Sequence, residues 1–393
     1  EHQVPPVETE MLQRMRFGSF MNNAGGTSGG RLQSSLACMS REPAFKESII
    51  RDFFRASPTS RFELFPSTTK SIEAFCSLLA HEAELRERPI KILLPDDAHY
   101  SWFNVAQQHR NHAFLTFLPL ERGSDSIHDV RLRGGDFVVA IFTLANTVSG
   151  RTTDIAWFDR TLEHVRQETG ADCHVFVDAA LSGCSISRDF LDLREDAPAA
   201  RVRQILDQSF ALVQSGFKDY LQAGSLLFFD DSPFECCESL NDESGLAAAV
   251  AGNSHPIIRF APITSIPESP SLAFLLFSKE YTAFRKESFL KFEQQLVRAI
   301  PQAARYKTRR LFPLLHVEFD SASTAAGLCA ELLRKGYNPI SIDAEPTVLR
   351  LFPTPTNQDI TSAIGSYLEG ELDDLRGELD DLDEHAAEVE LQV

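Results

Sequence analysis

No run of about 18 apolar residues occurs in the 393-residue sequence, so no segment is expected to span a membrane. An excess of basic residues is also missing: 38 Lys and Arg stand against 56 Asp and Glu, a net charge of −18. Nucleic acids and anionic membranes attract basic surfaces, so neither is an expected partner. The first residues, EHQVPPVETE, have no basic segment followed by an apolar run, and therefore do not predict a signal peptide.

Cysteine pairs with metal-binding spacing are absent too. The seven cysteines are scattered, without a CxxC pair and without a second cluster that would complete a zinc site. An odd, scattered set is typical of a reducing compartment, where buried thiols pack as small apolar groups. We therefore expect a cytoplasmic protein without a metal. The adjacent Cys236 and Cys237 are the one pair with a potential for redox chemistry.

The acidic excess is unevenly distributed along the chain. Residues 369–393 hold 11 Asp and Glu and one Arg, which is −10 of the net −18. The hexapeptide GELDDL occurs there twice, at 370–375 and 377–382, with its leucines at heptad-like spacing. Two heptads are too short for a stable coiled coil, so we expect a solvated, partly helical tail, with a docking element as the alternative.

The rest of the chain has an ordinary globular composition, with 43% hydrophobic and 24% charged residues. Residues 1–45 are rich in Gly, Ser and Asn but include several Met and Phe, and are expected to form an arm that packs on another subunit or domain. Residues 46–255 are expected to form a large domain, 256–369 a small C-terminal α+β domain, and 370–393 the acidic tail.

Helical and strand patterns alternate through the large domain. Residues 136–144, DFVVAIFTL, are continuously apolar, as in a strand buried on both faces. The alternation predicts an α/β fold: a mostly parallel sheet with helices on both faces, which binds ligands at the carboxyl ends of its strands. Helices are expected at 71–87, 102–110, 154–168, 274–301, 325–335 and 359–368, and strands at 91–94, 114–118, 136–144, 174–177, 209–214, 225–229, 314–319, 339–342 and 348–352.

Two candidate segments lie early in the large domain. The hydroxyl-rich PSTTKS at 66–71 precedes a predicted helix, whose free amides and dipole favour an anion such as phosphate; a plain Ser/Thr helix cap is the alternative. His99 follows the strand at 91–94 in the sequence DDAHYS. It suits a base, a ligand or a flat ring for stacking, and a purely structural histidine is the alternative.

Two more candidates follow later strands. Asp178 ends an apolar strand in VFVDAALSG, at 175–183, where a buried carboxylate can meet a cationic ring nitrogen; a helix-capping Asp is the alternative. Lys218, in SGFKDY after the strand at 209–214, is placed as a lysine that forms a Schiff base when buried.

The order of these segments resembles that of fold-type-I pyridoxal-phosphate (PLP) enzymes: a phosphate loop, a His, an Asp, and a Lys about 40 residues later. The group II amino-acid decarboxylases are the most similar class, and DAALSG looks most like the PLP-dependent bacterial histidine decarboxylases. The resemblance covers roughly residues 40–230. It implies that His99 stacks on the cofactor ring, that Asp178 pairs with the pyridine nitrogen, and that Lys218 forms the Schiff base.

The same resemblance implies the remaining cofactor contacts. Ala180 packs on the ring face opposite His99, Thr147 in TLANTVSG lies near the cofactor, and Ser215 binds the phosphate. Ser67, Thr68 and Thr69 occupy the place of the family's Gly-Gly-Thr phosphate loop.

The sequence also departs from the family pattern. Phe217 replaces the His before the lysine, Ser67 and Thr68 replace two glycines, and Lys70 stands where Glu is usual. The mobile-loop Tyr of the family has no identified counterpart. These departures concern the outcome of the reaction more than cofactor binding.

The resulting expectation is a PLP-dependent decarboxylase acting on an L-amino acid, histidine or another aromatic or apolar one, as a homodimer. Another fold-type-I reaction (an aminotransferase, a lyase, or a biosynthetic condensing or cyclising enzyme) is the second reading, and a non-catalytic scaffold the third. Arg350, in the strand at 348–352, is a candidate clamp for the substrate carboxylate, with a surface arginine on a strand edge as the alternative. A clamp in the ring plane would favour transamination or lyase chemistry.

Overall fold

The computed structural model describes residues 60–65, 68–121, 132–181, 188–215, 225–230, 279–301, 304–337, 339–353 and 358–373. The chain divides into two compact units, which part between Thr282 and Ala283. Several predicted features lie outside the described residues: the arm at 1–45, Ser67, Lys218, the Cys236–Cys237 pair and tail residues 374–393.

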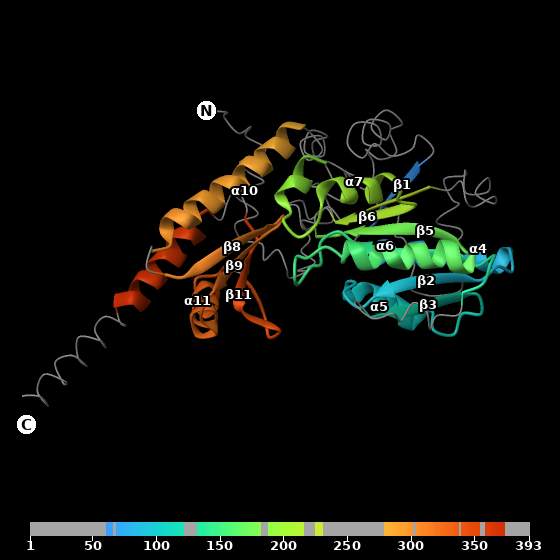
Figure 1. Ribbon diagram of the computed structural model, residues 1–393, viewed down its shortest axis with the longest axis horizontal. Coiled ribbons are helices and arrows are strands. Elements are labelled where there is room, and N and C mark those ends of the chain that lie inside the picture. Colours follow the sequence, from blue (N-terminus) through green and yellow to red (C-terminus); the bar gives the residue numbers. More distant parts are fainter. Residues whose placement is uncertain are drawn as a thin grey trace, which may run out of the picture. The chain divides into compact units, whose positions relative to one another are not determined.

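The first unit is built on a seven-stranded sheet in the order β1-β7-β6-β5-β4-β2-β3 (Figure 1). The strands from β3 through β6 in this order run parallel, whereas β7 is antiparallel to both of its neighbours. β5 is therefore central, and the carboxyl ends of β2, β4, β5 and β6 share one edge. The strands are β1 (Ser60–Phe65), β2 (Ile90–Pro95), β3 (Leu115–Leu120), β4 (Phe137–Thr143), β5 (Asp172–Ala179), β6 (Ala211–Ser215) and β7 (Ser225–Asp230).

Helices cover both faces of this sheet. On one face, Phe75 of α4 (Thr68–Leu85) and Trp102 of α5 (Tyr100–Gln108) both contact Phe176 of β5, each with ring centroids 4.8 Å apart. On the other face, Phe158 of α6 (Ile155–Glu163) packs on Phe142 of β4 at 5.1 Å. A further helix, α7 (Ala199–Asp207), lies beside α6, to which Arg201 ties it through Asp159.

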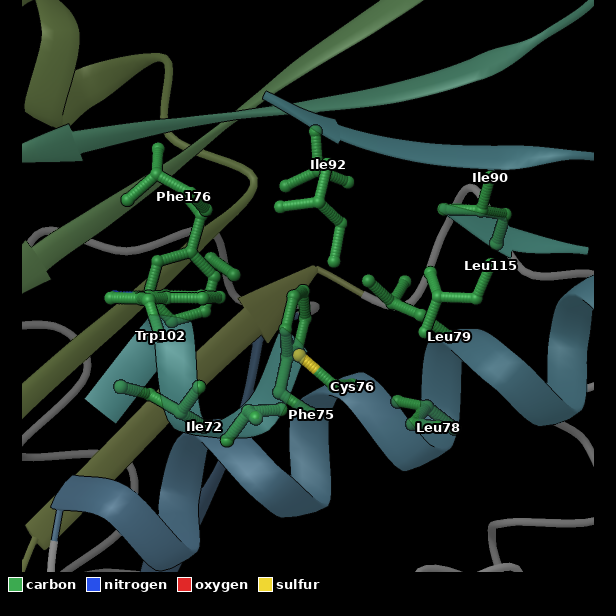
Figure 2. Close-up of a cluster of buried hydrophobic side chains, with 14 of the residues drawn as sticks. Ile72, Phe75, Cys76, Leu78, Leu79, Ile90, Ile92, Trp102, Leu115 and Phe176 are labelled. Carbon is green, nitrogen blue, oxygen red and sulfur yellow. The ribbon is translucent and has the colours of Figure 1, made fainter. Parts of the chain in front are cut away.

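The core between α4, α5 and the sheet is formed by side chains at helical spacing on α4. Ile72, Phe75 and Leu79 are fully buried and point at the sheet (Figure 2). Successive strand residues alternate between the faces, so Ile90, Ile92 and Phe176 present their side chains to this layer. Burying these side chains removes apolar area from water and fixes α4 and α5 against the sheet.

The second unit holds a four-stranded antiparallel sheet in the order β10-β11-β9-β8. Arg310 of β8 bonds Glu293 of α10, and Phe312 packs on Phe289 of the same helix at 5.0 Å, while α11 packs on β11 and β9. The elements are α10 (Lys279–Ala299), β8 (Tyr306–Leu311), β9 (Leu314–Phe319), α11 (Ala322–Arg334), β10 (Ile340–Ile342), β11 (Glu345–Leu351) and a helix at 360–373.

The observed elements match most of the predicted ones within a few residues. β1, β8 and α7 have no counterpart in the predicted pattern. The helix expected at 154–168 is α-helical only to Glu163 and continues as a π-helix over His164–Thr169, which Gly170 closes with a left-handed backbone. Among the described helices, none is long and apolar enough to cross a membrane.

Candidate active site

The candidate residues of the first unit lie at the edge of its sheet where the parallel strands have their carboxyl ends. Asp178 stands one residue before the end of the central strand β5, and His99 caps the helix α5 that follows β2. Thr147 lies in the turn after β4, and Ser215 is the last residue of β6. Parallel register places Asp178 between Thr143 and Val213 on the neighbouring strands. The topology thus brings segments from distant parts of the sequence to one edge.

Asp178 is a buried carboxylate with a donor on each oxygen. Its side chain is 1% exposed. The indole Nε1–H of Trp102 donates to Oδ2 at 2.9 Å, and the backbone N–H of Ala180 donates to Oδ1 at 3.0 Å. No Lys, Arg or His of the described residues pairs with this carboxylate. A buried carboxylate ordinarily requires a cationic partner, and each of its oxygens still has a lone pair to offer one.

Thr143 lies next to Asp178 and faces the same side of the sheet, because the two residues are partners in the parallel register. Its Oγ1 is buried and has no hydrogen-bond partner among the described residues. Native proteins rarely leave such an atom unsatisfied. The Thr143 hydroxyl, which has no hydrogen-bond partner, and the Asp178 carboxylate, which has no cationic partner among the described residues, fit a cationic ring at this place. The pyridinium of PLP is such a ring.

His99 is oriented by a chain of short hydrogen bonds. Its Nδ1 lies 2.9 Å from Ser101 Oγ, which lies 2.8 Å from Thr69 Oγ1 at the start of α4. The backbone N–H of Ser101 also donates to Nδ1, at 3.3 Å. A backbone N–H can only donate, so Nδ1 is the accepting nitrogen and the neutral ring carries its proton on Nε2. Thr69 then donates to Ser101, and Ser101 donates to His99.

The turn after β4 is tied to the loop that precedes His99. Asn146 Nδ2 donates to the carbonyl of Asp97 at 2.6 Å. Its Oδ1 accepts the N–H groups of Val148 and Ser149 at 2.8 and 2.9 Å, which wraps the turn around Thr147. The structure thus places Thr147 beside the His99 loop through the bonds of its neighbour.

A buried arginine holds the far side of the same turn. Arg194 Nη2 donates to the Gly150 carbonyl at 2.7 Å and to Asp196 at 3.0 Å, and its Nε donates to Thr152 Oγ1 at 3.1 Å. Asp196 also accepts the backbone N–H of Thr152 at 2.6 Å. Burial lowers the pKa of Arg194, and the charge of Asp196 opposes that shift. The buried pair therefore fixes the turn that carries Thr147.

The remaining predicted residues of the large unit are placed as follows. Ala180 is buried directly after β5 and contributes its N–H to Asp178. Thr68 and Thr69 are the first two residues of α4, and Lys70 forms an ion pair with Glu73 on the same helix. Ser67 and Lys218 flank described segments, the latter three residues beyond the end of β6, but both lie outside the described residues.

Arg350 belongs to the second unit. It is fully buried, pairs with Glu345 of its own strand, and donates from Nη1 to the Val348 carbonyl at 3.3 Å. β11 is flanked by β10 and β9, so the alternative of a surface arginine on a strand edge is wrong. Its role as a carboxylate clamp stays a prediction.

Sequence reasoning missed three residues that organise this edge. Trp102, Asn146 and Arg194 act through partners 76, 49 and 44 residues away. Each has a weak local signal: Trp102 lies one helical turn after the capping His99, Asn146 follows a buried strand, and Arg194 stands between short apolar runs. A pairing over such separations is set by the fold and is not visible in a local pattern.

Comparison with known proteins identifies the fold. No protein-family model matches the sequence, and no curated protein does. Glutamate decarboxylase from Lactobacillus brevis superposes with a TM-score of 0.57 at 14% identity, over 95% of this chain and 94% of its own. Serine palmitoyltransferase from S. paucimobilis with bound PLP gives 0.53 at 17%, over 93% and 84%. Sphingosine-1-phosphate lyase from Burkholderia pseudomallei gives 0.52 at 14%, over 96% and 87%.

At such identities the likeness establishes the fold and leaves the reaction open. The neighbours include a decarboxylase, a transferase and a lyase. The prediction of the fold class is confirmed. This chain has the fold of the fold-type-I PLP-dependent enzymes.

Proposed function

We propose that this chain is a PLP-dependent enzyme that decarboxylates an L-amino acid. The observation that carries the proposal is Asp178, a buried carboxylate at the carboxyl end of the central strand that lacks a cationic partner among the described residues. The protonated nitrogen of a pyridine ring supplies that partner. The fold shared with PLP-dependent neighbours and the order of His99, Asp178 and Lys218 in the sequence support the same reading.

PLP, when bound, supplies an electron sink for the pair of electrons left at Cα when a bond there breaks. The chain's own residues hold the cofactor. Asp178 binds the ring nitrogen, His99 provides the flat ring for stacking, and Ala180 packs on the opposite side. Lys218 is the residue that binds the cofactor covalently, and the amides and hydroxyls at the start of α4, with Ser215, bind its phosphate.

His99 contributes a defined tautomer as well as a flat surface. With Nδ1 accepting from Ser101, the proton of the neutral ring is on Nε2. Thr69 and Ser101 hold this orientation from the start of α4. The site thus presents an anionic group for a ring nitrogen and a histidine ring in a defined orientation.

Decarboxylation breaks the bond between Cα and the carboxylate, releases CO₂ and places a proton on Cα. Decarboxylation requires the bond between Cα and the carboxylate to be perpendicular to the plane of the cofactor ring. Histidine, or another aromatic or apolar amino acid, is the proposed substrate on the likeness of DAALSG to histidine decarboxylases. A homodimer acting in the cytoplasm, with residues 1–45 as an arm on the partner subunit, completes the proposal.

Another fold-type-I reaction is the second candidate. Arg350 of β11 is the proposed clamp for the substrate carboxylate in that reaction; in this structure its guanidinium is buried and paired with Glu345. Such a clamp leaves a different Cα bond perpendicular. The transferase and lyase among the structural neighbours are consistent with this reading.

The function is tested in two steps. Purified protein is first incubated with PLP, reduced with borohydride and digested; a pyridoxyl group on the peptide containing Lys218 supports a PLP enzyme, and its absence contradicts one. Pooled amino acids are then added to the holoenzyme, and CO₂ is measured against keto acid. CO₂ release that is lost in Lys218→Ala supports the decarboxylase, and keto acid without CO₂ supports the second candidate.

A further inference from the structure

Trp102 is the buried residue that joins the two proposed ring-binding groups. It is fully buried in α5, three residues after His99. Its backbone N–H bonds the His99 carbonyl at 2.9 Å, and its indole N–H bonds Asp178 Oδ2 at 2.9 Å. One residue therefore connects the start of α5 to the carboxyl end of β5.

The indole ring itself has little freedom to move. It packs edge-on against Phe176 at 4.8 Å, and Phe176 in turn contacts Phe75 of α4 at 4.8 Å (Figure 2). Phe176 and Asp178 are two residues apart on β5 and face the same side, so one ring contacts both. The core that fixes the ring thereby fixes the direction of its N–H.

The choice of residue type is informative. An indole N–H is a donor only, so it can bond a carboxylate but never a cationic ring nitrogen. Together with the Ala180 N–H on Oδ1, it sets the plane of the carboxylate and leaves one lone pair on each oxygen. A Phe is smaller but would fill much of the same space, and it would leave Oδ2 without this donor.

We propose that Trp102 is a positioning residue: its indole N–H holds the Asp178 carboxylate in the plane from which it meets the pyridine nitrogen of PLP, and ties that carboxylate to the His99 end of α5. This inference rests on the proposed cofactor. The expected consequence of losing the N–H is a weaker and spectrally altered cofactor complex in a protein that is still folded.

The experiment uses the two tryptophans of the chain. Trp102→Phe is compared with Trp157→Phe, which removes the other tryptophan, buried on α6 over the opposite face of the sheet. PLP is titrated against each full-length protein, and the absorbance of bound PLP is recorded across pH. We expect about tenfold weaker PLP binding and a shifted pH profile in Trp102→Phe, and neither in Trp157→Phe.

A second variant covers the case in which Trp102→Phe does not fold. In the Trp157→Phe chain the single remaining tryptophan can be replaced by benzothienylalanine, which has sulfur in place of the N–H at almost the same volume. The same weakening is expected. In the cofactor-free Trp157→Phe chain, the fluorescence of Trp102 should also shift when Asp178→Asn is added, which reports the bond without PLP.

The outcomes separate the two claims. If the wild-type chain forms no pyridoxyl-Lys218 adduct, the proposed function fails, and the fluorescence shift still decides whether Trp102 and Asp178 are bonded. If the wild type binds PLP and both the Phe and benzothienylalanine variants match Trp157→Phe in affinity and pH profile, the positioning role of Trp102 is overturned while the proposed function stands.

Discussion

Replacing Asp178 by Asn tests the group on which the proposed function depends. The substitution keeps the size and shape of the side chain but removes its charge and turns one oxygen into an NH₂ donor. In the native site both oxygens accept, one from Trp102 and one from Ala180. Whichever way the amide is turned, one of these two N–H groups then faces another donor.

Two magnitudes follow from this geometry. A buried donor left without its acceptor costs about 1–3 kcal/mol of stability. A hydrogen bond to a charged group contributes about 1.5–3 kcal/mol, so PLP binding should weaken roughly 10- to 140-fold if Asp178 meets the ring nitrogen. The apoprotein of Asp178→Asn should thus remain folded, and its affinity for PLP should fall because the bond to the ring nitrogen is lost.

The assay is a titration with PLP, read by absorbance and by quenching of tryptophan fluorescence, beside urea unfolding of each apoprotein. Asp172→Asn is the matched control, because Asp172 begins the same strand, has 51% of its side chain exposed, and pairs with Arg88 and His174 away from the site edge. It should bind PLP as the wild type does. Equal PLP affinity in Asp178→Asn and Asp172→Asn would show that Asp178 does not bind the ring nitrogen.

Three further predictions concern packing, a buried ion pair and thiol reactivity. Gly365→Ala should lower the free energy of unfolding by about 1–3 kcal/mol, because the new Cβ would lie 2.6 Å from the Ala299 carbonyl oxygen. Gly370→Ala on the same helix has open space around it and should be neutral or stabilising. Urea unfolding compares the two variants, and equal losses of stability would contradict the close packing at Gly365. Arg194→Met should lower the free energy of unfolding by about 3–5 kcal/mol, because it leaves the Asp196 carboxylate buried without its partner. Arg166→Met, at an exposed contact, should change the free energy of unfolding by less than about 0.5 kcal/mol. Similar values for both variants would argue against the buried pair. Iodoacetamide at pH 8 should modify native Cys173 about 100-fold more slowly than an ordinary thiol, since burial raises the pKa of Cys173 to about 11 and the reactive thiolate forms only as the pH approaches that value. Peptide mass spectrometry before and after unfolding measures the rate of modification. Rapid modification of the native thiol would show that Cys173 is not shielded.

The sequence predicted the parts of the fold that have strong local patterns. The apolar run at 136–144 became the fully buried β4, and the alternation of strands with helices became a mostly parallel sheet. β1 escaped notice because SRFELF carries two charges and pairs only at the sheet edge, with β7. The antiparallel direction of β7 has no local signal, since strand direction is decided by the connection and not by the strand's own residues.

The candidate site shows the same division. His99, Asp178 and Ser215 could be located because each follows or ends a strand whose pattern is clear. Trp102 was missed because an aromatic residue at helical spacing is typical of a core, and it does fill the core; its second role depends on a partner 76 residues away. The local sequence also could not predict the environment of Arg350, because an edge strand and an interior strand of a sheet can have the same short sequence.

The most direct test of the central claim is reduction of the PLP-treated chain with borohydride, followed by mass spectrometry of its peptides. We expect one pyridoxyl group, on Lys218, which disappears in Lys218→Ala and forms at lower PLP concentration in the wild type than in Asp178→Asn. A chain that takes up no pyridoxyl group at saturating PLP, or that takes it up equally on surface lysines with and without Lys218, would contradict it.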